Sequence, residues 1–510
     1  MVVTAYLTSR LAIIALVLLL VSTACDSRRS SKQILEVWTL ALSPYFDDYI
    51  TELVEGFEAG HPGVEVIWVD VPFDAFNRKL VAAVAAGRGP DVINLSDRDF
   101  ARVAALGGLA GIDDYLEPAV TERYLAGARG VLRIGGRLRA LPWYLTTSVR
   151  MVNEDRLAAG GLSAEGEGDG KADGPGRLRL ADDWAGLREQ ARAYHEATGG
   201  FLFSLPLGDT SELPTMLLSE GLLPFREADG RLVADLDRPE IVAEGSAWVQ
   251  LYLDGALPRS AATRDHTAVV ELYQNGQIAV AQSGANMLRR IRDASPEVFA
   301  STRVLPPITG GLGRSHIAVM VMGVSASSER PALAAELAAW MTSPRHQTEL
   351  AKRSGVLPST PASLADPYFD PPAAEAASEG EDAAEGSAAG RASDDGPDAE
   401  AERLLAYARS LSARSLPDAV AFTPAIEAWP DLRRAFDEGI KAALLDGADV
   451  GQTLEQIDAD WDRILRSARP ATLESLPRPE PMERRETSAD LAAPGMQKQA
   501  ATAVLAGWGG

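Results

Sequence analysis

The chain of 510 residues contains a single cysteine, Cys25, and five histidines. One cysteine excludes an intramolecular disulfide, a cysteine-based zinc cluster and an iron–sulfur site. The histidines are scattered, with no His-Glu-x-x-His sequence and no pair at the four-residue spacing that holds zinc on a helix. The sequence also lacks a Gly-x-Ser-x-Gly motif, a Gly-Lys-Ser/Thr phosphate loop and a dinucleotide fingerprint in a strand–helix context. We therefore expect no cofactor, no bound metal and no catalytic residue.

Positive charge is also scarce, because Lys and Arg total 49 against 72 Asp and Glu, a net charge of −23. Such a chain cannot neutralise phosphates, which argues against nucleic acid as a partner. Much of the excess acid lies in two Gly/Ala-rich stretches: residues 371–402 hold ten carboxylates and one Arg, and residues 165–173 hold four carboxylates and one Lys. Their composition cannot form a core. We predict disordered insertions at 163–178 and 371–402, and a disordered tail at 470–510.

Long hydrophobic runs are absent apart from one near the N-terminus, Leu11 to Val21. Its eleven residues are too few to cross ~30 Å of hydrocarbon as a helix but suit the core of a signal peptide. The following Ser22-Thr23-Ala24-Cys25 resembles a lipobox, with Ser22 where the pattern usually has Leu. We predict a lipoprotein signal peptide over 1–24, lipidation of Cys25 and a linker over 25–33; the alternative is an ordinary secretory peptide. Lipidation would anchor an exported protein to a membrane, on its periplasmic or extracellular face.

The length predicts at least two domains, and the first of them alternates strand and helix. Short apolar strands are expected at 34–38, 64–71 and 91–95. Between them, Tyr45, Tyr49, Leu53 and Phe57 recur every four residues and predict a helix with one apolar stripe. Strands separated by helices in this way form a parallel sheet with both faces covered. Ligands of such sheets bind beyond the carboxyl ends of the strands.

The rest of the chain continues this α/β pattern. Gly135-Gly136 predicts the turn of a hairpin within 131–153, and Asp182-Asp183 predicts the cap of a helix that runs to about His195. Apolar periodicity predicts further strands and helices. The strands are expected at 277–282 and 318–324, and the helices at 240–256, 266–275, 331–341, 345–353, 404–411, 429–445 and 453–465.

Short motifs in a fixed order run along most of the chain. They are Ala85-Ala86-Gly87-Arg88-Gly89-Pro90-Asp91-Val92, Ala140-Leu141-Pro142-Trp143, Asn153-Glu154-Asp155-Arg156-Leu157, Asp182-Asp183-Trp184, Asn275-Gly276-Gln277-Ile278-Ala279 and Trp340-Met341-Thr342-Ser343-Pro344. Each motif alone is weak, but their shared order resembles the bacterial extracellular solute-binding proteins of the carbohydrate class, the maltose-binding-protein-like family 1. The resemblance covers about residues 34–469.

This resemblance implies an α/β fold of the two-lobed periplasmic-binding-protein type (class II). Each lobe would be a β-sheet flanked by helices, and hinge crossovers would join the two lobes around a ligand cleft. Carried over by motif, lobe I comprises 34–141 and 305–328, and lobe II comprises 142–304 and 329–469.

Sugars present hydroxyl groups and apolar ring faces, so a sugar site needs carboxylates, arginines and aromatic rings. Asp97 and Arg98 follow the third strand and Ser43 follows the first, at the end of the sheet where ligands bind. The resemblance implies ligand contacts for all three. The alternative for Asp97 and Arg98 is a surface ion pair or a helix cap.

The resemblance implies ligand contacts in the rest of the chain as well. Trp143 and Tyr144 follow the first crossover, and Trp429 matches a stacking tryptophan of the family; for these aromatic residues the alternative is a place in the core. Asn286 stands where the family often has a stacking tryptophan, which favours a smaller or more polar ligand. The other implied contacts are Thr146, Asp209 and Gly284.

The resemblance and the missing catalytic motifs together predict a binding protein rather than an enzyme. We expect a solute-binding lipoprotein of an ABC importer that takes up a sugar or similar polyol. Its partners would be the solute, the permease subunits and, through the lipid anchor, a membrane, and the protein itself would be a monomer. The alternatives are an exported glycan-acting hydrolase, which would use a pair of the many carboxylates, and a receptor for a non-sugar solute.

Overall fold

The computed structural model describes residues 32–164, 178–372, 397–424, 426, 428–468, 470, 471 and 476. The chain divides into two compact units. Unit 1 contains the chain up to Leu145 together with Val319–Tyr368, and unit 2 contains Thr146–Ala318 and the chain from Phe369 onward. Two long strands, β6 (Ala140–Asn153) and β14 (Ile317–Val324), contribute residues to both units.

Unit 1 contains the alternating strands and helices expected from the first hundred residues. Strand β1 (Gln33–Leu40) pairs in parallel with both β2 (Val64–Val71) and β3 (Val92–Leu95). Strand β14 continues the sheet antiparallel to β3, and the short β15 (Leu357–Pro358) pairs with β6. The predicted parallel arrangement of the first three strands is therefore confirmed.

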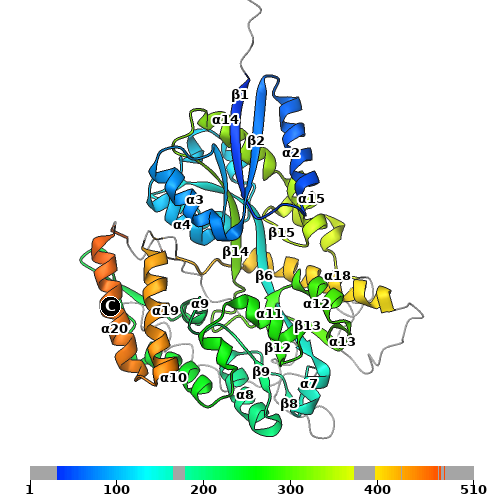
Figure 1. The fold of residues 1–510 in the computed structure, drawn as a ribbon, viewed down its shortest axis with the longest axis vertical. Coiled ribbons are helices and arrows are strands. Elements are labelled where there is room, and N and C mark those ends of the chain that lie inside the picture. Colours follow the sequence, from blue (N-terminus) through cyan, green and yellow to red (C-terminus); the bar gives the residue numbers. More distant parts are fainter. Residues whose placement is uncertain are drawn as a thin grey trace, which may run out of the picture. The chain divides into compact units, whose positions relative to one another are not determined.

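Helices accompany this sheet, as Figure 1 shows for α2 beside β1 and β2. In α2, Tyr49, Ile50, Leu53 and Phe57 are buried at the predicted helical spacing. The helices of unit 1 are α2 (Asp47–Gly60), α3 (Phe73–Ala85), α4 (Asp97–Ala105), α5 (Pro118–Thr121), α6 (Ala126–Gly130), α14 (Pro331–Met341), α15 (Pro344–Ser354) and α16 (Pro361–Leu364), with short 3-10 turns at Ile112–Asp114 and Pro367–Phe369.

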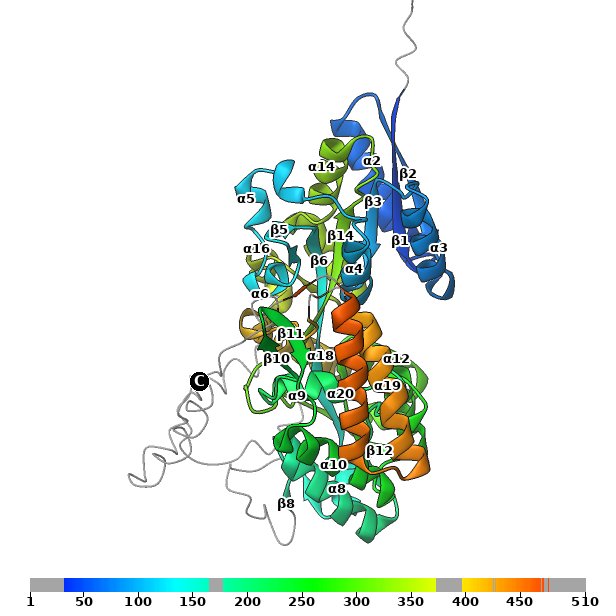
Figure 2. The ribbon, with the colours of Figure 1, turned by 90° about the vertical axis from the view of Figure 1, so that its left-hand side faces the viewer.

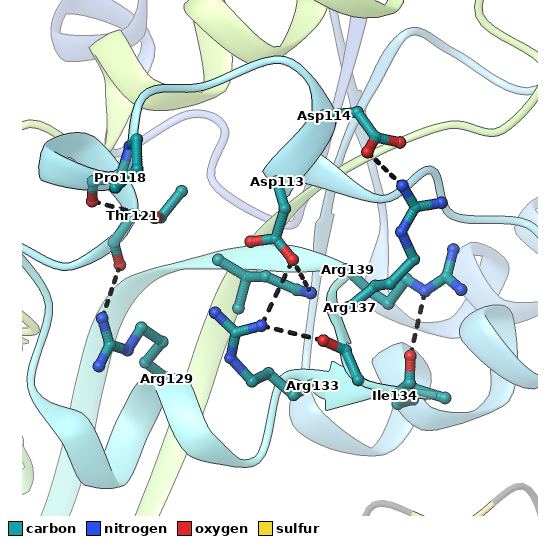
Figure 3. A network of polar contacts seen from close by, with 11 residues as sticks. Asp113, Asp114, Pro118, Thr121, Arg129, Arg133, Ile134, Arg137 and Arg139 are labelled. Carbon is teal, nitrogen blue, oxygen red and sulfur yellow. Dashed lines mark hydrogen bonds and ion pairs between the residues drawn. The ribbon is translucent and has the colours of Figure 1, made fainter.

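The predicted hairpin of unit 1 consists of β4 (Arg133–Ile134) and β5 (Arg137–Leu138), joined by two glycines with positive φ. Figure 3 shows how the preceding turn holds it. The Asp113 carboxylate accepts hydrogen bonds from the Leu138 backbone N–H at 2.9 Å and from Arg133 at 3.3 Å. Asp114 forms an ion pair with Arg137. The arginines of this hairpin are thus partnered within unit 1 and act as structural residues.

Unit 2 has its own strands around the second half of β6. Strand β12 (Ile278–Gly284) lies antiparallel to β6 and parallel to β9 (Phe201–Phe203), while β13 (Thr302–Leu305) also pairs with β6. Two small pairs complete the strands: β7 (Leu162–Ser163) with β8 (Leu178–Arg179), and β10 (Phe225–Ala228) with β11 (Arg231–Ala234).

Most of unit 2 is helical, and α19 and α20 lie side by side in both views (Figures 1 and 2). Helix α8 has the predicted cap, because the Asp183 side chain accepts a hydrogen bond from Gly186 N–H. The helices are α7 (Glu154–Ala159), α8 (Trp184–Thr198), α9 (Leu213–Ser219), α10 (Pro239–Leu253), α11 (His266–Gln274), α12 (Met287–Ala294), α13 (Pro296–Ala300), α18 (Pro397–Ser415), α19 (Trp429–Asp446) and α20 (Val450–Ser467), with 3-10 turns at Arg259–Ala262 and Leu416–Asp418.

The units differ from the expected lobes in three segments. Residues 329–368 and 142–145, expected in the second lobe, belong to unit 1, and residues 305–318, expected in the first lobe, belong to unit 2. The first difference arises from packing on α2: Trp340 Nε1 donates to Leu53 O at 3.0 Å, and the Tyr49 hydroxyl donates to His346 O at 2.8 Å. These contacts join α14 and α15 to α2.

Parts of all three segments predicted to be disordered are folded in the structure. Residues 397–402, assigned to the second insertion, form the start of α18, whose Leu405 and Ala408 are buried in a core cluster of unit 2. The tail predicted to be disordered from residue 470 onward still contacts unit 2 at its start. Leu232 N–H donates to Ala471 O, and Leu476 is buried in unit 2. Likewise, residue 163 lies in β7 and residue 178 in β8, and the linker ends where Gln33 begins β1. The central parts of both insertions lie outside the described residues.

Candidate functional site

Three of the predicted contacts of unit 1, Ser43, Asp97 and Arg98, follow strands that end at one edge of its sheet. Because β1, β2 and β3 are parallel, the chain after Leu40, Val71 and Leu95 leaves the sheet at the same edge. Ser43 follows the first of these strands, and Asp97 follows the third. The structure therefore brings Ser43 and Asp97 to the edge predicted for ligand binding. Arg98 lies in the first turn of α4, and its side chain is not among those described.

Asp97 occupies the first position of α4, where helix N–H groups have no partner within the helix. Ser96 caps this end: its hydroxyl accepts from Asp99 N–H at 3.2 Å and donates to the Asp99 carboxylate at 2.8 Å. The N-terminal end of a helix carries partial positive charge, which attracts a negatively charged side chain placed here. Asp97 is thus suited to accept hydrogen bonds from ligand hydroxyls.

A third residue at this edge, Asp70 at the end of β2, was not among the predicted contacts. Its Oδ1 accepts from the Thr39 hydroxyl at 2.7 Å and from Leu42 N–H at 3.0 Å, and its Oδ2 accepts from Ser43 N–H at 3.1 Å. Asp70 therefore fixes the loop that carries Ser43. From the sequence, the signal for this role is weak: Asp70 is one of two acidic residues in a mostly apolar strand, Val64–Val71, and the one next to its end.

The stripe expected on the first helix also needs correction at Tyr45. The four-residue spacing placed Tyr45 on the buried face together with Tyr49. The helix begins only at Asp47, so Tyr45 lies in the preceding loop and is 89% exposed, whereas Tyr49 is buried. The expectation failed because helical spacing continues to match by chance beyond the end of a helix.

Trp143 and Tyr144 are neighbours on β6, within unit 1. Their ring centroids lie 5.3 Å apart in an edge-to-face arrangement. The Trp143 ring has 0% exposure, and its buried Nε1 has no hydrogen-bond partner among the described residues. Burial raises the pKa of the Tyr144 hydroxyl to about 12, so this hydroxyl stays protonated and able to donate at neutral pH. The core alternative for Trp143 fits its burial.

In unit 2, three predicted contacts lie at one end of the strand pair β6–β12. Gly284, the last residue of β12, is in register with Ser148, so Thr146 and Asn286 both lie just beyond that end. A Cβ at position 284 would lie 2.4 Å from Asn286 Oδ1, so a side chain there would require the Asn286 amide to move. The structure thus brings Thr146, Gly284 and Asn286 together.

Asp209 and Trp429 lie elsewhere in unit 2. Asp209 forms an ion pair with Lys441 of α19. Trp429 is only 3% exposed, and its ring centroid lies 6.1 Å from that of Trp461 and 6.4 Å from that of Phe225 within the core. This packing fits the core alternative for Trp429 better than a stacking contact with a ligand.

The remaining predictions concern the anchor and metals. Cys25 lies outside the described residues. Among the described residues there is no group of three or more His, Cys, Asp or Glu side chains arranged to hold a metal ion. In the same part of the chain, no helix has the length and hydropathy needed to span a membrane.

The mixed α/β fold belongs to the two-lobed class of periplasmic binding proteins, as comparison with solved structures shows. A putative oligosaccharide periplasmic-binding protein from Synechococcus sp. MITs9220 is 29% identical, with a TM-score of 0.69 over 85% of this chain and 99% of that chain. A cyclic alpha-maltosyl-1,6-maltose binding protein from Arthrobacter globiformis shares the fold at 20% identity, with a TM-score of 0.62 over 86% of this chain and 100% of that chain.

Residues 43–348 match the family of bacterial extracellular solute-binding proteins, and this chain belongs to that family. Among curated relatives, an uncharacterised lipoprotein in the oleD 5′ region of Streptomyces antibioticus is 23% identical over 70% of this chain and 77% of its own length. A maltotriose-binding protein of Pyrococcus abyssi is 22% identical over 50% of each chain. The family and fold predicted from the ordered motifs are therefore confirmed.

Proposed function

We propose that this protein is an extracytoplasmic solute-binding lipoprotein of an ABC importer, which binds a sugar or similar polyol and delivers it to a membrane permease. The main support is membership of the extracellular solute-binding family. The relatives named for maltotriose and for an oligosaccharide favour a carbohydrate as the solute.

The strand-end residues described above have the chemistry that this function needs. In unit 1, Asp97 supplies a carboxylate acceptor and Ser43 a hydroxyl; in unit 2, Thr146 and Asn286 supply a hydroxyl and an amide. Such groups match sugar hydroxyls, which both donate and accept. Binding without covalent change is the activity that we assign to the protein.

Calorimetric titration of the purified mature protein with glucose, maltose and maltotriose tests this assignment. We expect saturable 1:1 binding of at least one of them, and chromatography of the mixture should recover the sugar unchanged. Shortened products would support the glycan-acting hydrolase instead. Absence of binding for the whole sugar panel, with saturable binding of a phosphorylated or cationic solute, would replace the sugar by a non-sugar ligand.

The lipid anchor is a separate part of the proposal. It is supported by the single cysteine after the apolar run and by the relative named as a lipoprotein. In a bacterial host, Cys25→Ser should move the protein from the membrane fraction to the soluble fraction, and globomycin should cause the wild-type precursor to accumulate. A protein of mature size that forms normally in globomycin would rule out lipidation.

A further inference from the structure

The loop that joins β1 to α2, residues 41–46, is held more firmly than a surface connection requires. Three donors from this region converge on the Asp70 carboxylate, and one of them, the Thr39 hydroxyl, itself accepts from Trp68 Nε1 at 2.7 Å. Ala41 has φ of 51°, in the left-handed region that residues with a side chain seldom adopt. Such a conformation persists only where the surroundings enforce it, and it is concentrated at functional sites.

This loop carries a large aromatic ring that the free protein leaves in water. Tyr45 is 89% exposed, far more than any other large hydrophobic or aromatic residue described. The chain turns directly after it, where Phe46 N–H donates to Leu42 O at 3.1 Å. Burial of an aromatic ring is favourable, so the exposed Tyr45 ring does not stabilise the free protein. Its exposure is explained if a bound ligand covers the ring.

We propose that Tyr45 is the stacking platform of unit 1 for the ring of a cyclic sugar, and that Asp70 is the positioning residue that holds the platform in place. The inference rests on the proposed function. It adds a contact that motif comparison did not assign. Tyr45 lies two residues after Ser43, in the loop that follows β1, and Asp97 follows β3 at the same edge of the sheet, so this edge carries polar groups as well as an aromatic ring.

The geometry also points to the kind of sugar. A pyranose ring has a flat face of C–H groups that can lie on an aromatic ring and remove apolar surface from water. An open-chain polyol such as sorbitol carries the same hydroxyl groups but has no fixed flat face. Stacking on Tyr45 therefore favours cyclic sugars over linear polyols.

Calorimetry with maltotriose and sorbitol tests the platform. Tyr45→Ala should weaken maltotriose binding about tenfold, in the range of one aromatic contact, while Tyr45→Phe should keep nearly wild-type affinity. Tyr115→Ala is the matched control, because Tyr115 is also a partly exposed tyrosine of unit 1, at 37% exposure, and lies outside the loop. Because Tyr45 makes so little contact with the fold, its variants should unfold at the wild-type temperature.

The role of Asp70 is tested by a double-mutant cycle. Asp70→Asn cannot accept from both Leu42 and Ser43 as the carboxylate does, so amide exchange at these two residues should accelerate and maltotriose affinity should fall. If Asp70 acts through Tyr45, adding Asp70→Asn to the Tyr45→Ala variant should lower maltotriose affinity far less than Asp70→Asn lowers it in the wild type. Fully additive losses would show that Asp70 does not position Tyr45.

The possible failures are distinguishable. If the wild type binds neither a cyclic sugar nor sorbitol, the proposed function and this inference both fail; if it binds sorbitol alone, only the inference fails. If the wild type binds maltotriose and Tyr45→Ala binds it equally well, only the platform is wrong, and the exposed ring then becomes a candidate contact for the permease. If Tyr45→Ala weakens sorbitol and maltotriose binding equally, the preference for a cyclic ligand is refuted.

Discussion

Replacing Asp97 by alanine is expected to weaken sugar binding about 100-fold, because in the site that we propose it would remove two charge-assisted hydrogen bonds to ligand hydroxyls, each of roughly 1.5 kcal/mol. Asp97→Asn should lie between this variant and the wild type, since the amide keeps one acceptor but loses the charge. Calorimetric titration of the three proteins with maltotriose measures the effect.

Two measurements separate this loss of binding from a loss of folding. Asp97 stands at the first position of α4, so its removal should lower stability by only about 0.3–1 kcal/mol through the helix dipole. Glu55→Ala removes the same charge from an exposed position on α2 and should leave affinity unchanged. Wild-type affinity in Asp97→Ala would remove Asp97 from the site.

The second large effect concerns stability. Glu244→Ala is expected to lower the free energy of unfolding of unit 2 by about 3 kcal/mol, the lower end of the range for removing one partner of a buried ion pair, because the Glu244 side chain is 18% exposed. The Glu244 carboxylate pairs with Arg188 through two hydrogen bonds and also accepts from Trp248 Nε1 at 2.8 Å. Without it, the buried Arg188 guanidinium, which lies 4.7 Å from the centroid of the Trp248 ring, loses the carboxylate that forms its two hydrogen bonds.

Urea unfolding monitored by tryptophan fluorescence measures this change. Glu189→Ala is the control, since Glu189 is exposed on α8 beside Arg188, and its removal should alter stability by no more than about 0.5 kcal/mol. Glu244→Gln should be intermediate, because the amide oxygen can still accept one hydrogen bond. A loss below 1 kcal/mol in Glu244→Ala would show that Arg188 finds water or another acceptor.

Local patterns predicted many elements of this fold closely. The strand at Val64–Val71 and the helix of Trp184–Thr198 with its Asp183 cap appear where alternation and capping residues placed them. These patterns involve residues only a few positions apart, so they predict a helix or strand without knowledge of the rest of the fold. The same reasoning explains the error at Tyr45, where the spacing continued past the helix start.

Burial of individual side chains was less predictable. Trp429 matched a stacking position of the family, but it packs with Phe225 and Trp461, which are 204 and 32 residues away in the sequence. Residues 397–402 looked unable to fold by composition, yet they begin a helix whose later residues reach a buried cluster. In both cases the outcome depends on partners that sequence spacing does not identify.

By itself, the sequence determined the family, the α/β class and the parallel strands that bring Ser43 and Asp97 to one sheet edge. The tertiary structure decided which side chains are exposed and which loops are held. Asp70 lies 27 residues from Ser43 and fixes its loop, and Lys441 lies 232 residues from Asp209 and pairs with it. Periodicity in the sequence shows which face of a helix or strand is apolar. A contact between residues far apart in the sequence forms only when the whole chain has folded.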